Sequence, residues 1–119
     1  MTKESGDIVF EDLFGNQNTE KILFKLIIDE KCYAQELANN FATAIYGFQR
    51  TLKKLEKANV LINYTEGRTR VYQFNPRYPF LKELKQFIEK AYTTLPDTIK
   101  DQYYEPKIRK RPRRTGKPI

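Results

Sequence analysis

Apolar residues recur every three or four positions over four segments of this chain, a spacing that is typical of amphipathic helices. The predicted helices cover residues 19–29, 34–41, 44–58 and 79–93. The first is apolar nearly all round, apart from a narrow polar strip of Lys21, Lys25 and Asp29. Such a helix is either central to the fold or part of a subunit interface. The last helix has an apolar stripe wide enough to contact two neighbours.

Between the third and fourth helices the spacing changes to alternation. Residues 60–65 and 70–75 are predicted to form two strands, and Gly67 in the connection permits the positive φ of a tight turn. Tyr64 and Tyr72 are expected to form a cross-strand pair, with a platform for stacking on bases as the alternative. Residues 32–34 can form no more than a minimal strand. The pattern therefore predicts a mainly α fold with one small β-hairpin.

The helix at 44–58 has two distinct faces. Ile45, Phe48, Leu52 and Leu55 share one side and should face the core. The opposite side and its flanks are polar and mostly basic, and they carry Tyr46, Gln49, Arg50, Lys53, Lys54 and Lys57. Gly47 is expected to allow a close crossing with the helix at 34–41.

Charge divides the chain into three parts. The formal net charge is +7 and the isoelectric point is about 9.5, which favours a polyanionic partner. Counted separately, residues 1–30 carry −4, residues 31–94 carry +6 and residues 95–119 carry +5. We expect an N-terminal arm over 1–12, one domain over 13–94 and a basic, flexible tail over 95–119.

Several classes of protein are disfavoured by what the sequence lacks. It has one cysteine, Cys32, and no histidine, which argues against a disulfide and against a transition-metal sensor. Cys32 is expected to be buried, although oxidant sensing by a single thiol stays an alternative. The sequence contains no glycine-rich phosphate loop and no acidic cluster at metal-ligand spacing. Neither catalytic activity nor a cofactor is therefore expected. No apolar run is long enough for a membrane span, so a cytoplasmic location is expected.

The order of elements resembles that of a winged helix-turn-helix domain (α-β-α-α-β-β-α) with an added C-terminal helix and basic tail. The matching segments are Leu13–Gly15, Tyr33–Ala38, Leu52–Leu61 and Glu66–Asn75. The chain is most similar to the arsenic-repressor-like group of small prokaryotic regulators. This resemblance implies a homodimer that binds double-stranded DNA, with the helix at 44–58 as the recognition helix.

Two positions depart from the family pattern. The turn before the recognition helix has Ala42 in place of glycine, and the helix begins with Ala44 in place of a Ser/Thr cap. Thr43 is the alternative cap, one residue earlier. Asn59 replaces the glycine that usually follows the helix, and asparagine tolerates the left-handed conformation required there.

The resemblance assigns candidate DNA contacts to three elements. On the recognition helix, Tyr46, Gln49 and Arg50 are expected nearest the bases, because Gln and Arg can form paired hydrogen bonds with base edges. Thr43, Lys53 and Lys57 are expected to contact phosphates. The hairpin and the tail should contact the backbone or the minor groove through Arg68, Arg70, Arg109, Arg111, Arg113 and Arg114. A merely solvated basic face is the alternative to each of these contacts.

The function expected from the sequence is a sequence-specific regulator of transcription that binds double-stranded DNA, is associated with the nucleoid and has no catalytic activity. Two alternatives stay open. Winged helices also serve as protein–protein adaptors, although an adaptor has little need for a basic third helix and hairpin. The basic tail also suits RNA.

Overall fold

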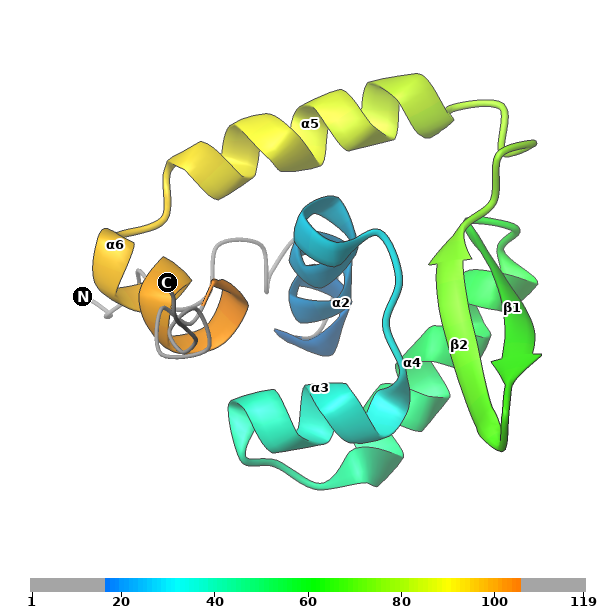
Figure 1. The fold of residues 1–119 in the computed structure, drawn as a ribbon. Coiled ribbons are helices and arrows are strands. Elements are labelled where there is room, and N and C mark those ends of the chain that lie inside the picture. The colour runs from blue at the N-terminus through cyan, green and yellow to red at the C-terminus, as the bar shows by residue number, and fades with distance from the viewer. Residues whose placement is uncertain (1–16, 106–119) are drawn as a thin grey trace, which may run out of the picture.

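A computed structural model describes residues 17–105. Helices and one hairpin follow in the order predicted, with two short helical turns added at the C-terminal end (Figure 1). The elements are α2 (Gln17–Asp29), α3 (Ala34–Phe41), α4 (Ile45–Lys57), β1 (Leu61–Glu66), β2 (Thr69–Phe74), α5 (Leu81–Thr93), α6 (Asp97–Ile99) and the π-helical turn η2 (Lys100–Tyr104). Each predicted helix and strand is confirmed, and its bounds are within two residues of those expected.

Helix α2 lies at the centre of the molecule. Helix α5 crosses on one side of it and α3 and α4 lie on the other (Figure 1). Its buried residues include Ile22, Phe24 and Leu26, which join the core residues of every neighbouring element. The prediction that this helix is central is confirmed, because its apolar sides meet different neighbours at once.

The polar strip along α2 contains one buried cation, Lys25. Its side chain is 1% exposed. The Nζ atom lies 2.8 Å from Asp29 Oδ2 on the same helix and 3.8 Å from Glu36 Oε2 on α3. A buried ammonium requires such partners to offset its lost hydration. The contact was not predictable from the sequence, because Glu36 reaches Lys25 only after α3 packs on α2.

The segment before α3 forms a minimal strand, as expected. Cys32 and Tyr72 form an isolated antiparallel bridge, with hydrogen bonds of 3.0 Å from Cys32 N and 2.8 Å from Tyr72 N. This bridge attaches the hairpin to the body of the domain on the β2 side. It also places Cys32 in the core, confirming that residue as buried.

Residues 97–105 belong to the packed part of the chain, although they were expected to be part of the flexible tail. Tyr104 is only 2% exposed, and its ring meets Phe24 edge-on with the centroids 5.6 Å apart. Tyr103 stacks on Phe41 of α3 at 5.0 Å. The sequence pattern does not predict these turns because they are too short to show an apolar period.

Helix α5 buries one side and leaves apolar residues on another. Ile88, Ala91 and Tyr92 are buried, whereas Phe80 is 62% exposed and Phe87 is 44% exposed. The predicted wide stripe is therefore present, and part of it is exposed.

Three positions at which the sequence departs from the family pattern lie in the turns on either side of α4. Ala42 adopts a left-handed conformation with φ 53°, and Asn59 does so with φ 69°. The N-cap of α4 is Ala44, and no side chain caps the helix, so the alternative of Thr43 as the cap is wrong. An extended backbone at Ala44 starts the helix without that hydrogen bond.

Gly47 allows a close approach, but to a different helix from the one expected. A Cβ atom at Gly47 would lie 2.7 Å from Asn18 Nδ2 on α2. The prediction that Gly47 lies at the crossing with α3 is therefore wrong, although α3 and α4 do pack against each other. The crossing partner was not visible from the sequence because α2 and α4 meet only in the tertiary fold.

Candidate nucleic-acid interface

The rotation of α4 is set by two residues of its apolar face. Phe48 and Leu52 are both 0% exposed and belong to the main core. Thr51 also lies inside and donates a hydrogen bond of 2.9 Å to the carbonyl of Gly47. With that side fixed, the polar side must face solvent. The exposed residues are those predicted, namely Tyr46, Gln49, Arg50, Lys53, Lys54 and Lys57.

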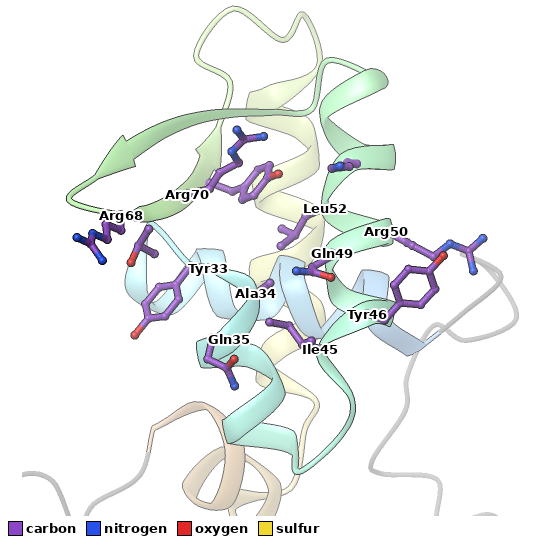
Figure 2. A pocket seen from close by; sticks show the side chains of 13 residues that line it. Tyr33, Ala34, Gln35, Ile45, Tyr46, Gln49, Arg50, Leu52, Arg68 and Arg70 are labelled. Atoms are coloured by element: carbon purple, nitrogen blue, oxygen red, sulfur yellow. The ribbon is translucent and has the colours of Figure 1, made fainter.

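A hollow of about 770 Å³ lies between α4 and the hairpin (Figure 2). Its apolar lining residues include Ile45, Leu52 and Tyr72, and burial raises the pKa of the Tyr72 hydroxyl. Around them lie four cationic side chains, Arg50, Lys53, Arg68 and Arg70, together with Gln49. The structure thus brings six of the twelve predicted contact residues, counting Tyr46, to one concave surface.

The exposed side chains of α4 point to two sides of the helix. Figure 2 shows Gln49 directed toward the hollow, whereas Tyr46 and Arg50 lie together on the side away from the hairpin. The Arg50 guanidinium carbon is 5.6 Å from the centre of the Tyr46 ring. Such stacking favours one orientation of an otherwise mobile arginine.

The hairpin supplies the other wall of the hollow. Glu66 pairs with Thr69 across a two-residue turn, in which Gly67 has φ 62°. Arg68 lies in the turn and is exposed, as is Arg70 on the adjoining strand. The Lys31 ammonium donates a hydrogen bond of 3.1 Å to Glu66, which raises the Lys31 pKa and ties the hairpin to the α2–α3 connection. Because both groups are exposed, this ion pair contributes little stability.

The tyrosine pair predicted in the hairpin is wrong. The register pairs Tyr64 with Val71 and Asn63 with Tyr72. Since successive residues of a strand face opposite sides, Tyr64 and Tyr72 lie on opposite faces of the hairpin. Tyr72 faces the domain, where it bonds to Cys32 through the backbone.

Two residues of this surface were not predicted from the sequence. Tyr33 and Gln35 flank the start of α3, line the hollow and are exposed (Figure 2). The Gln35 amide donates a hydrogen bond of 3.0 Å to Asn39 Oδ1. A signal was available, because Leu37, Ala38 and Phe41 face inward and leave position 35 on the outer side of the helix.

The remaining candidate residues lie elsewhere. Thr43 is exposed in the turn before α4, where its backbone N–H donates to the carbonyl of Ala38 at 3.1 Å. Lys57 is exposed at the far end of α4, outside the hollow. The four tail arginines fall outside the described residues and are Arg109, Arg111, Arg113 and Arg114.

The chemistry available to Cys32 is limited by its surroundings. Burial raises the pKa of its thiol to about 12. The thiol is therefore protonated at neutral pH, and its burial shields it from solvent. Within residues 17–105, no group of three or more His, Cys, Asp or Glu side chains is arranged to hold a metal ion.

No protein-family model and no curated protein matches the sequence. The structure is similar to the crystal structure of AntR, an antimony-specific transcriptional repressor. The match has a TM-score of 0.51 at 16% identity and covers 70% of this chain and 77% of that chain. The chain has a winged helix-turn-helix fold.

In this winged-helix domain α3 and α4 form the helix-turn-helix and the β1–β2 hairpin is the wing. The resemblance inferred from the sequence is confirmed for the fold, whereas 16% identity leaves membership of the arsenic-repressor-like group undecided. Over residues 17–105, no helix is long and apolar enough to cross a membrane.

Proposed function

We propose that this protein is a transcriptional regulator that binds double-stranded DNA at a specific sequence and has no catalytic activity. One observation carries this proposal: α4 is locked by Phe48 and Leu52 so that a polar, basic face projects beside an arginine-lined wing. A helix presented in this way fits the major groove while the wing contacts the adjoining backbone. The structural likeness to a transcriptional repressor supports the same function.

The exposed residues of α4 are proposed to have two different roles. Gln49 and Arg50 are the proposed base-reading residues, since both can form paired hydrogen bonds with base edges. Lys53, at the hollow, and Lys57, beyond it, are proposed phosphate contacts that hold the helix in register. Arg68 and Arg70 are proposed to contact the backbone or the minor groove, as are the four tail arginines.

We also propose that two copies pair, so that the bound site is partly palindromic with half-sites about one helical turn apart. The exposed Phe87 of α5 and its exposed N-cap residue Phe80 support this part of the proposal, because an exposed apolar surface is covered when two copies meet. Helix α5 lies on the far side of α2 from α3 (Figure 1).

The function is tested by selecting bound duplexes from a random pool with the full chain and comparing Arg50→Ala with the wild type. Arg50→Ala should cost about 1–3 kcal/mol at the selected site and relax the preference at one base pair. Lys54→Ala is the matched control, because Lys54 is exposed on α4 but does not line the hollow.

Enrichment of no sequence would reject the regulator and favour a protein–protein adaptor. An equal loss for Arg50→Ala on all duplexes would make Arg50 a phosphate contact.

A further inference from the structure

The hollow between α4 and the wing is built by three separate elements. On α4, Ile45, Gln49 and Lys53 follow one another at four-residue spacing and therefore share one side of the helix. On β2, Arg70 and Tyr72 are two residues apart and therefore lie on the same face of the strand. The start of α3 supplies the remaining part of the lining, namely Tyr33, Ala34 and Gln35. The space is thus enclosed on several sides by parts of the chain that the fold holds in place.

The middle of the hollow is apolar. Figure 2 shows Ala34 and Leu52 there, with Ile45 close by. Leu52 is 0% exposed and Tyr72 is 4% exposed, so both lie at the bottom of the hollow, whereas Ala34 and Ile45 are half-buried. Contacts to the phosphates of a duplex are made by polar and basic groups and need no apolar floor. The proposed DNA contacts therefore do not account for this part of the surface.

The charged side chains around the apolar floor are all cationic. Four of the described residues that line the hollow are Lys or Arg, and none of them is Asp or Glu. Within residues 17–105, the salt bridges involve Lys25 and Lys31, neither of which is one of these four. Burial raises the pKa of the Tyr72 hydroxyl and the neighbouring Arg70 opposes that rise, which places a cation beside the floor. The hollow is thus complementary in charge to an anion.

The size of the hollow suits a small molecule. Its volume of about 770 Å³ lies within the range of roughly 300–1,000 Å³ that is typical of small-molecule sites. Such sites combine an apolar lining with a few polar groups that fix the orientation of the ligand. Here the amides of Gln35 and Gln49 join the cations as polar groups, and Gln35 is itself held by a hydrogen bond of 3.0 Å to Asn39.

We propose that the hollow binds a planar aromatic carboxylate, with its rings on the apolar floor and its carboxylate between Lys53 of α4 and Arg70 of β2. The carboxylate can accept charge-assisted hydrogen bonds from both walls. A flat ring suits the site because the exposed Tyr33 and the guanidinium groups offer planar partners for stacking.

This ligand regulates DNA binding by occupying the same surface. Lys53, Arg68 and Arg70 are proposed DNA contacts and also line the hollow, so a bound acid neutralises cations that the duplex needs. Acid and duplex therefore exclude each other. The competition rests on the proposed function, whereas binding of the acid to the free protein does not.

The first experiment measures binding to the full chain by isothermal titration calorimetry, with 2-naphthoate as the probe. Two controls separate its parts: 2-naphthamide keeps the rings without the charge, and acetate keeps the charge without the rings. 2-Naphthoate should bind with a stoichiometry of one per chain and at least about tenfold more tightly than either control, because only it uses the floor and the cations together. In NMR spectra the methyl signals of Ile45 and Leu52 should shift, whereas that of Ile62, outside the hollow, should not.

Two substitutions test the assigned contacts. Arg70→Gln should weaken 2-naphthoate by about tenfold and leave 2-naphthamide unchanged, since it removes only the partner of the carboxylate. Lys54→Gln is the matched control, because it removes the same charge from an exposed position outside the hollow. Ala34→Leu fills the hollow and should weaken both aromatic probes, and Ala58→Leu, at an exposed position outside it, should weaken neither. If Ala34→Leu does not fold, the exposed Arg70→Gln decides.

The second experiment titrates the selected duplex at rising concentrations of 2-naphthoate. The apparent dissociation constant of the duplex should rise in proportion to the probe concentration above its own dissociation constant, as for simple competition, and acetate at equal concentration controls for ionic strength.

Three results overturn the site: no binding of 2-naphthoate at millimolar concentration, equally tight binding of 2-naphthamide, or methyl shifts confined to residues outside the hollow. Simultaneous binding of probe and duplex overturns the regulation. Failure to select any duplex rejects the proposed function, and the titrations of the free protein still decide whether the site exists.

Discussion

Gln49 and Arg50 are neighbours in sequence, yet they face different sides of α4. Gln49 is directed toward the hollow, and Arg50 stacks on Tyr46 away from the wing (Figure 2). Consecutive helix residues are separated by about 100° around the axis. Adjacent polar residues therefore contact different parts of a binding partner. At this scale the side chains of α4 that line the hollow extend to two sides of the helix.

Ala42 stands in the turn of the helix-turn-helix at a backbone position that favours glycine. Its φ is 53° and its side chain is exposed. Replacing it with glycine should raise the free energy of unfolding by about 0.5–1 kcal/mol, because relief of the left-handed strain exceeds the extra entropy of the unfolded chain. Urea denaturation measures the change. Ala58→Gly is the control, since Ala58 has φ −80° and should lose stability or stay neutral. Equal effects of both changes would contradict this explanation.

At the scale of elements, burial of one face of a helix determines which side chains its opposite face exposes to solvent. Phe48 and Leu52 turn the basic side of α4 outward, while Phe41 links α3 to both α4 and the C-terminal turn. Helices α2 and α3 are joined by a contact of another kind, the buried ammonium of Lys25 between Asp29 and Glu36. Since this contact joins α2 to α3, its loss should destabilise the helix-turn-helix.

The Lys25 contact predicts an unequal response to two substitutions. Asp29→Asn leaves the buried ammonium with Glu36 alone and should cost about 1–3 kcal/mol of stability. Lys25→Met removes the buried charge and keeps the apolar stem, so it should cost less, about 1 kcal/mol. The midpoints of chemical denaturation measure both. A larger loss for Lys25→Met than for Asp29→Asn would show that the ion pair itself stabilises the fold.

At the scale of the whole molecule, the faces of the domain have different properties. The hollow between α4 and the wing is cationic, whereas Phe87 of α5 and its N-cap residue Phe80 are exposed. Helix α5 lies on the far side of α2 from α3 (Figure 1). This separation allows two copies to pair through α5 without covering the proposed DNA-binding surface. Pairing and DNA binding can therefore be tested independently.

Phe87→Lys should convert a dimer into a monomer, because it places a charge in the middle of the proposed apolar contact. Sedimentation equilibrium of the wild type should give twice the 14.2 kDa chain mass, and the variant should give one chain mass. Gln86→Lys is the matched control, since it adds the same charge at an exposed neighbouring position. A wild type that sediments as a single chain at tens of micromolar removes the dimer from the proposal.

Local patterns in the sequence determined the elements of this protein and the outward face of α4. Apolar spacing depends only on residues within one or two turns of each other, which is why α3, α4 and the hairpin were predicted closely. The left-handed conformation at Asn59 was expected on another ground, the family resemblance, in which glycine usually follows the helix.

Only the tertiary structure decided which residues meet across elements. It placed Glu36 beside Lys25, Asn18 beside Gly47, and Tyr103 on Phe41. It also brought Tyr33 and Gln35 to the hollow and separated Tyr64 from Tyr72. Contacts of this kind depend on how whole helices and strands are set against one another, and no periodicity within a segment encodes that geometry.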